Sequence, residues 1–206
     1  MTHRAGRDVL PEYVRCGVLG EWPGSGVRMT GGTQEGRLAI VVRDELPDDR
    51  QAIRAVHRLA FGRDDEADLV DALRDGGYVR ASLVAEVERV IVGHILFSDL
   101  PIVGETGTVA ALALAPLAVL PEYQRQGIGS QLIRAALDAC RGQGHRIVVV
   151  LGHSEFYQKF GFSSELARLL ESPFSGKPSF MALELVAGAL QGVKGKVQYA
   201  SPFGLA

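Results

Sequence analysis

Residues 117–130 read Leu-Ala-Val-Leu-Pro-Glu-Tyr-Gln-Arg-Gln-Gly-Ile-Gly-Ser, and this stretch decides the fold. It passes from an apolar run through a short polar loop into Gly127 and Gly129, which open a helix. Glycines let the backbone approach a ligand closely and turn its N–H groups outward. The start of a helix adds partial positive charge and Arg125 adds a full one. Together these features predict a cradle for a phosphate or diphosphate group.

Three other known motifs also place a glycine or a serine at a turn, and the chain matches none of them in full. A phosphate-binding P-loop needs Gly-x4-Gly-Lys-Ser/Thr, and the chain has no such string. A dinucleotide fingerprint needs a third glycine where Leu132 stands. A nucleophile elbow needs Gly-x-Ser-x-Gly, and Gly152-His153-Ser154-Glu155 is followed by Phe156. A serine hydrolase that uses Ser154 and His153 is thus an alternative, although adjacent residues rarely reach nucleophile–base geometry.

Downstream of the cradle, the sequence predicts a helix and then a buried strand. Residues 127–141 form an amphipathic helix, with Leu132, Ile133, Ala136, Leu137 and Cys140 on one face. Residues 147–151 are a continuous apolar run, typical of a strand that is buried on both faces. This order indicates a right-handed crossover to a parallel strand. A short helix at 155–160 and strands at 180–186 and 194–200 follow.

Upstream, the pattern predicts an antiparallel meander. Strands at 81–87 and 90–98 are joined by a tight turn at Glu88 and Arg89, and a third strand runs over 108–119. Pro116 cannot donate to a sheet ladder, so it marks a bulge or an unpaired edge. Before the meander we expect a strand at 38–43 and helices at 47–61 and 65–74. The fold class is therefore mixed α/β.

Composition excludes several classes of protein. The chain has 206 residues with a net charge of -2, so a nucleic-acid partner has no electrostatic support. The longest apolar stretch, 109–120, is too short for a transmembrane helix, and we expect no membrane partner. Cys16 and Cys140 lack a C-x-x-C partner, so we expect no metal site and a reduced, buried Cys140. No apolar segment follows the first charged residues, which favours the cytoplasm.

The chain divides into an extension and one domain. Residues 1–37 are rich in glycine without periodicity, and we expect a flexible N-terminal extension in which Met29 is an alternative start. The domain is expected over 38–206, with its core at 38–186 and a C-terminal strand or tail at 187–206.

Two motifs carry a resemblance to a known family. Gln124-Arg-Gln-Gly-Ile-Gly129 resembles the Q/R-x-x-G-x-G/A signature of the GCN5-related N-acetyltransferases, the GNAT superfamily. Glu155-Phe-Tyr-Gln-Lys-Phe-Gly-Phe162 resembles the F-Y-x-x-x-G-F segment that follows this family's fifth strand. The two together look most like the bacterial YhbS-type subgroup. The resemblance implies a central mixed sheet with an antiparallel meander and a splayed parallel strand pair, flanked by helices.

By the same resemblance, the donor is an acyl-CoA, most often acetyl-CoA. Its diphosphate would rest on the backbone N–H groups of 125–130, and its pantetheine arm would pair with 117–119 like an added strand. The candidate cofactor-binding residues are thus Leu117, Ala118, Val119, Gln124, Arg125, Gln126, Gly127, Ile128, Gly129 and Ser130. Tyr157 matches the family's general acid, and a phenol remains protonated at neutral pH.

The attacking amine must lose a proton, yet residues 110–115 carry no ionisable side chain where many relatives place a carboxylate. His153 and Glu122 are the candidate bases, although a helix-capping or surface role is as good a reading of His153. His94 lies inside a strand and is expected to be structural.

The predicted function is transfer of an acyl group to a primary amine in a ternary complex; the alternative is a non-catalytic acyl-CoA sensor. The acceptor, a small molecule or a peptide, is not readable. The acidic run 64–68 could attract a cation, but a solvated helix start is preferred. The oligomeric state stays open, a homodimer included.

Overall fold

The computed structural model describes residues 39–205, so the extension predicted for 1–37 lies outside the described residues. Its centre is a six-stranded sheet in the order β1-β2-β3-β6-β7-β9. All neighbours in this sheet are antiparallel except β6 and β7, which are parallel. The predicted mixed α/β class is confirmed. The strands are β1 (Ile40–Asp44), β2 (Val79–Val87), β3 (Val90–Asp99), β6 (Leu112–Val119), β7 (Ile147–Leu151) and β9 (Phe180–Glu184).

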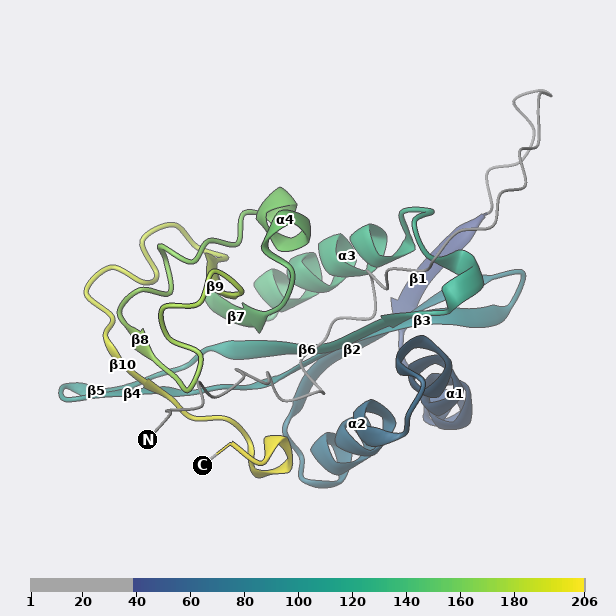
Figure 1. The fold of residues 1–206 in the computed structure, drawn as a ribbon, viewed down its shortest axis with the longest axis horizontal. Helices are drawn as coiled ribbons and strands as arrows, with labels where there is room; N and C mark the ends of the chain where they lie inside the picture. Colours follow the sequence, from purple (N-terminus) through teal and green to yellow (C-terminus); the bar gives the residue numbers. More distant parts are fainter. Residues whose placement is uncertain (1–38, 206) are drawn as a thin grey trace, which may run out of the picture.

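Helices cover both faces of the sheet. α1 (Arg50–Phe61) and α2 (Asp65–Asp75) lie on one face, and α3 (Ile128–Gly142) and α4 (Ser154–Tyr157) lie on the other (Figure 1). α3 is the predicted amphipathic helix, and its apolar stripe is buried from Leu132 to Cys140. Short 3-10 turns occur at Pro47–Asp49, Pro121–Tyr123, Gln158–Phe160 and Ser201–Phe203.

The parallel pair of strands parts in the middle of the sheet. β6 pairs with β7 only from Leu112 opposite Val148 to Leu114 opposite Val150. Beyond Leu114, β6 continues along β3 to Val119, and its other edge there has no strand partner among residues 39–205. Ile95 pairs with Leu117 but Phe97 pairs with Leu114, so two residues of β6 oppose one of β3. This is the bulge predicted at Pro116.

A second, smaller sheet has the order β5-β4-β10-β8 and corrects two predicted strands. The predicted strand 108–119 is divided, because Val109 pairs with Ile102 in this sheet whereas Leu112 pairs with Asp99 in the main one. The predicted strand 194–200 is reduced to three residues. The four strands are β4 (Ile102–Gly104), β5 (Gly107–Val109), β8 (Leu170–Glu171) and β10 (Gly195–Val197).

The last predicted strand of the main sheet is also shorter than expected. β9 ends at Glu184, not at residue 186, because the Glu184 carboxylate accepts hydrogen bonds from the Gly188 and Leu190 N–H groups. These bonds, 3.0 and 2.7 Å long, turn the chain away from the sheet.

The core has one cluster on each side of the sheet. The cluster on the α3 side holds Cys140, which is buried and free, and burial raises the pKa of its thiol to about 12. The cluster on the α2 side includes Val197 and Phe203, so the C-terminal segment packs into the domain. Within residues 39–205, no helix combines the length and the apolar character that crossing a bilayer requires.

Candidate functional site

The residues for which the sequence predicts a phosphate cradle lie in the turn before α3 and in its first residues. Gly127 is the N-cap in a left-handed conformation, with φ of 86°, and Arg125 also has a positive φ of 61°. Gln131 N–H donates to Gly127 O over 3.0 Å, so the N–H groups of residues 128–130 precede the helical hydrogen-bond ladder. This arrangement gathers donors at the positive end of the helix, as an anion site requires.

The helix start lies against the end of β6. A Cβ added at Gly129 would be 3.7 Å from the Phe156 ring and 3.8 Å from Val119. Two glutamines hold the connecting loop: Gln124 Nε2 donates to Val119 O over 3.0 Å, and Gln126 Nε2 donates to Glu122 O over 2.9 Å. In this structure both side chains therefore shape the loop and hold its backbone in place.

The backbone of Val119 faces the gap between β6 and β7. Leu120 N–H donates to Val92 O over 2.8 Å, and Ala118 lies opposite His94. Because hydrogen-bonded pairs alternate along an antiparallel ladder, Val119 directs its N–H and C=O away from β3. Of the three predicted strand residues, Ala118 is thus committed to β3, whereas the Val119 N–H is directed to the side of β6 that faces away from β3.

Tyr157 is held by aromatic packing just beyond the end of β7. It is 1% exposed, and its ring makes edge contacts with Phe156 and Phe162 at centroid distances of 5.2 and 5.6 Å. A Cβ added at Gly152 would lie 2.5 Å from the Tyr157 ring. Gly152 therefore allows the ring to lie directly against the strand end. Phe156 and Phe160 are the more exposed members of this aromatic run.

The candidate bases lie at the surface. His153 is exposed at the N-cap of α4, where its carbonyl, not its side chain, accepts from the Phe156 and Tyr157 N–H groups. Glu122 is exposed in the 3-10 turn before the cradle.

The acidic run 64–68 is paired with arginines. Asp64 binds Arg58 at 2.9 Å, Glu66 binds Arg63 at 2.5 Å and Asp68 binds Arg54 at 2.7 Å. Asp64 and Asp68 connect α2 to α1, and the Glu66 carboxylate is fully buried. The run therefore joins the two helices. This refines the preferred reading as a solvated helix start and leaves little charge to attract a cationic ligand.

A buried polar network on the α1 face was not predicted. His57 Nε2 lies 2.8 Å from His94 Nδ1, and His94 Nε2 lies 2.8 Å from Ser82 Oγ. Ser82 donates to Glu45, so its oxygen accepts from His94, and His94 in turn accepts from His57. Within residues 39–205, the buried His57 Nδ1 has no hydrogen-bond partner. The expectation that His94 is structural agrees with this network.

Burial controls the charges in the network. Burial lowers the pKa of His57 well below 6.5, and the neighbouring His94 and Arg74 lower it further. Burial also lowers the pKa of His94. Burial alone would raise the pKa of Glu45, but hydrogen bonds from His94, Arg74 and Ser82 lower it to about 2. The network thus holds an ionised carboxylate beside two neutral imidazoles at neutral pH. No sequence signal joined His57 to His94, because the two are separated by 37 residues and have no ligand spacing.

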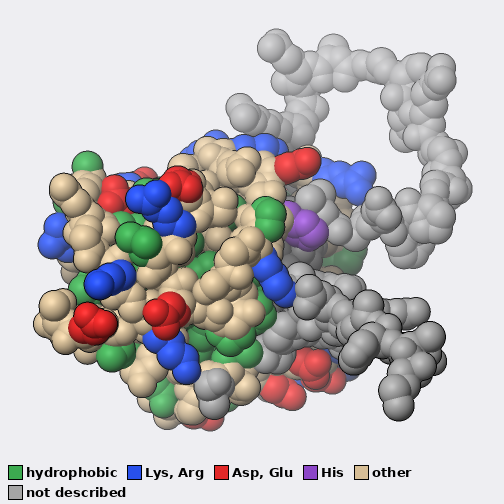
Figure 2. Space-filling model, turned by 60° about the vertical axis from the view of Figure 1, so that its left-hand side comes forward, with side chains coloured by type: hydrophobic (Ala, Val, Ile, Leu, Met, Phe, Trp, Pro, Cys, Tyr) green, Lys and Arg blue, Asp and Glu red, His purple; other side chains and the backbone are tan. Residues whose placement is uncertain are grey.

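In the part of the chain that the structure describes, no three His, Cys, Asp or Glu side chains are grouped so as to hold a metal ion. Charges of both signs are scattered over the face shown in Figure 2, without an area of one sign.

Comparison with known proteins gives the family. A family model described as an acetyltransferase (GNAT) domain matches residues 79–164. The chain is 36% identical over 166 residues to an Escherichia coli K12 protein described as the uncharacterized N-acetyltransferase YhbS, covering 80% of this chain and 98% of the relative.

Two solved structures share the fold closely. One is an E. coli YhbS structure in complex with CoA, with a TM-score of 0.76, 32% identity and coverage of 84% of this chain and 96% of that one. The other is a GNAT acetyltransferase from Brucella melitensis in complex with acetyl-CoA, with a TM-score of 0.67, 34% identity and coverage of 80% and 97%. The parted strands, the glycine cradle and these likenesses agree, and the chain belongs to the GNAT family of N-acetyltransferases.

Proposed function

We propose that this protein transfers an acyl group, in the first instance acetyl, from acyl-CoA to a primary amine by direct transfer in a ternary complex. The observation that carries the proposal is the parting of β6 and β7 after Leu114 and Val150, beside the glycine cradle at the start of α3. CoA supplies an activated thioester and a thiolate leaving group. The relatives whose structures contain CoA or acetyl-CoA support this choice of donor.

The residues of the cradle fit a diphosphate. Gly127 has a positive φ and no atom within 4 Å of an added Cβ, so the space in front of the helix start is open. The N–H groups of residues 125–130 would donate to the diphosphate, and the Arg125 side chain would add positive charge. Gln124 and Gln126 would contribute through the loop geometry described above.

The strand edge orients the thioester. Val119 N–H points into the gap, where it would donate to the thioester carbonyl oxygen and stabilise the negative charge that develops there. Leu117 and Ala118 would line the same segment, so that the pantetheine arm extends β6 as an added strand.

Tyr157 is the proposed general acid. Its hydroxyl would donate a proton to the departing thiolate, and Phe156 and Phe162 hold its ring in one position. The proton of the attacking ammonium would leave through His153 or Glu122, which are exposed and can pass it to bulk water. Since an acyl-CoA donor is a cytoplasmic metabolite, we propose that the protein works in the cytoplasm.

The test is the release of CoA thiol from acetyl-CoA in the presence of a panel of primary amines, with the N-acylated product identified by mass spectrometry. Transfer to at least one amine is the expected result. Tight binding of acetyl-CoA by calorimetry without turnover on any amine would contradict the proposal and favour an acyl-CoA sensor. The absence of an ionisable side chain on β6 is the observation that keeps this second candidate open.

The hydrolase alternative has little support. His153 and Ser154 begin α4 as neighbours, and no hydrogen bond joins their side chains within the described chain. Labelling of Ser154 by a fluorophosphonate probe would revive it.

A further inference from the structure

Two adjoining pockets lie on the α2 side of the sheet. The inner one reaches the point where β6 and β7 begin to part, and the outer one extends from it toward the start of β6 and the end of β3. The inner pocket is a narrow space of about 30 Å³ between residues 113–115 of β6 and 149–151 of β7. Phe174, Phe203 and Leu205 close it, and all three pack against the cluster on the α2 side. Ala115 and Leu151, at one end of the inner pocket, lie where β6 and β7 begin to part, so this pocket leads away from the gap in which the donor is expected under the proposed function.

The outer pocket is much larger and opens to solvent. It has a volume of about 890 Å³ and shares Tyr199 and Leu205 with the inner one. An acceptor whose amine reaches the parted strands would therefore leave the rest of its body in the outer pocket.

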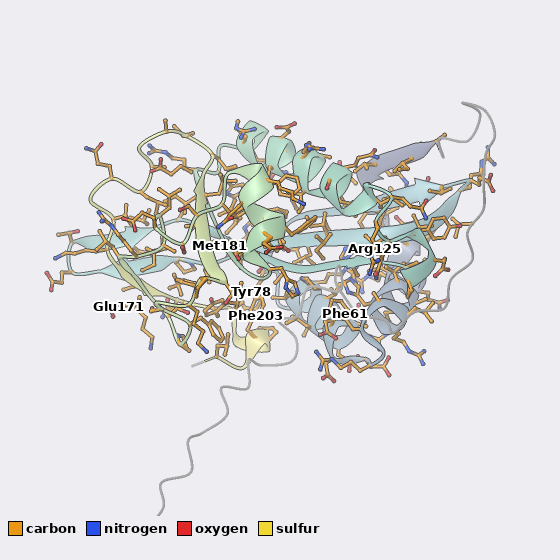
Figure 3. All side chains as sticks on the ribbon, turned by 45° about the horizontal axis from the view of Figure 1, so that its top comes forward. Phe61, Tyr78, Arg125, Glu171, Met181 and Phe203 are labelled. Atoms are coloured by element: carbon orange, nitrogen blue, oxygen red, sulfur yellow. The ribbon has the colours of Figure 1, made fainter. Side chains whose placement is uncertain are left out.

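The C-terminal segment holds the wall of these pockets in place. Tyr199 makes edge contacts with Phe174 and Phe203, with ring centroids 6.4 and 5.6 Å apart. The hydroxyl oxygen of Tyr78, which directly precedes β2, lies 3.2 Å from that of Ser201. Figure 3 labels Tyr78 and Phe203 in this region, and Figure 1 draws the final turn beside α2. The wall is thus aromatic and fixed at both ends.

The charges of the lining disfavour cationic acceptors. Asp99 is the carboxylate among the residues that line the outer pocket, and it forms an ion pair with Arg80. Lys196 is the cation of the same lining. The remaining lining side chains are largely apolar or aromatic, including Tyr78, Val103 and Tyr199. A second ammonium group on the acceptor would lie near Lys196, and the carboxylate of the lining, Asp99, is already paired with Arg80. An apolar acceptor would instead contact the apolar and aromatic side chains of the lining.

We infer that the acceptor is a primary amine with an apolar, aromatic body and no second positive charge, held between Tyr199, Leu205 and the alanines that precede β6. This inference rests on the transfer activity proposed above and names its substrate class.

The test compares two acceptors and one variant that fills the pocket. The acceptors are 2-phenylethylamine and 1,4-diaminobutane, and the rate of CoA thiol release from acetyl-CoA is measured for each. Ala110 is exposed and lines the outer pocket, so Ala110→Trp fills the pocket without opening a hole in the core. Ala187→Trp is the matched control, because Ala187 is also exposed but lies in the turn after β9.

We expect kcat/KM for 2-phenylethylamine to exceed that for 1,4-diaminobutane by roughly ten-fold or more, as the burial of one or two carbons would produce. Ala110→Trp should raise KM for 2-phenylethylamine by roughly ten-fold and leave KM for acetyl-CoA unchanged. Leu205→Ala should also raise KM for 2-phenylethylamine. Ala187→Trp should leave this KM unchanged, and so should Leu169→Ala, because Leu169 is exposed.

Other outcomes separate this inference from the proposed function. Equal or faster turnover of 1,4-diaminobutane, or no effect of Ala110→Trp, overturns the inference while transfer stands. If Ala110→Trp instead impairs only hexanoyl-CoA relative to acetyl-CoA, the pocket serves the acyl chain and the inference is wrong. If no amine is turned over, the binding of 2-phenylethylamine to the CoA-saturated protein is measured by calorimetry. Binding that Ala110→Trp weakens supports the inference about the pocket although transfer fails. No binding overturns the inference.

Discussion

His57 Nε2 lies 2.8 Å from His94 Nδ1, and this contact joins helix α1 to the middle of the sheet. Both imidazoles are fully buried, and through Ser82 they connect to a carboxylate at the edge of the domain. The two facing nitrogens share one proton, so both cannot be protonated at once without breaking this contact, and burial lowers the pKa of both rings. The free energy of unfolding should therefore fall as the pH drops below about 6.5, a range in which most surface groups do not titrate.

Acid should destabilise the fold in two steps. The folded pKa values of His57 and His94 lie below the ordinary value of 6.5, so their contribution is complete above about pH 6.5 and is lost as the pH falls below it. The contribution of Glu45 is complete above its ordinary value of 4.5 and is lost as the pH falls toward about 2. Urea unfolding at several pH values from 8 down to about 2 measures this dependence.

The variant His57→Phe tests whether the loss of stability below pH 6.5 comes from His57. In His57→Phe the titrating ring is replaced by one that can still stack on Phe61, whose ring lies 6.0 Å away. The free energy of unfolding should then fall less steeply between pH 6.5 and 5 than in the wild type. An unchanged slope in a folded variant would show that His57 does not couple to folding.

Gly127 offers a test of the cradle with an internal control. Gly127 and Gly144 both have φ of 86°, and neither has an atom within 4 Å of an added Cβ. Alanine at either position should cost about 1–2 kcal/mol of stability, because the left-handed region disfavours a side chain. Only Gly127→Ala should weaken acetyl-CoA binding by calorimetry, since Gly144 lies beyond the far end of α3. Equal affinities in the two variants would argue against a cradle at residues 125–130.

Tyr157→Phe removes the proposed acid while keeping its packing. The Phe156 and Phe162 contacts involve the ring, so the variant should fold like the wild type. We expect kcat to fall by roughly 10²-fold or more, the usual effect of losing general acid catalysis. Tyr123→Phe, which deletes a hydroxyl from the turn before the cradle, should retain kcat. Full activity of Tyr157→Phe would show that the thiolate leaves without this acid.

Cys140 should resist modification in the folded protein. Its thiol is buried with a pKa of about 12, so at pH 8 almost none is thiolate. In a Cys16→Ser background, iodoacetamide should label Cys140 only after urea unfolding. Rapid labelling of the native protein would contradict the burial of this helix face.

Helices and strands whose apolar residues follow a regular pattern were predicted from the sequence, and those without such a pattern were missed. The helix at 127–141 and the run at 147–151 were recognisable because their apolar residues recur regularly or without a break. β4, β8 and β10 are only two or three residues long, too short for a pattern, and their pairing joins segments far apart in the chain. The division of the strand at Ala110 depends on this second sheet, so the sequence alone could not show it.

The site was predicted to a similar extent. Glycine spacing predicted a cradle at the start of α3, which stays a prediction, and Pro116 marked the bulge that the structure shows beside the parted strands. The buried pair His57 and His94 was not predicted, because only the packing of α1 on β3 brings them together. The wall of Tyr199, Phe203 and Leu205 was not predicted either, because a C-terminal turn gives no signal of where it docks.

The central claim is that N–H groups at the start of α3 bind the diphosphate of an acyl-CoA. A crystal structure of the protein with acetyl-CoA tests it most directly. The claim predicts diphosphate oxygens about 2.7–3.2 Å from backbone nitrogens of residues 125–130, with the thioester beside Val119. A nucleotide bound elsewhere, with those N–H groups still facing solvent, would contradict it.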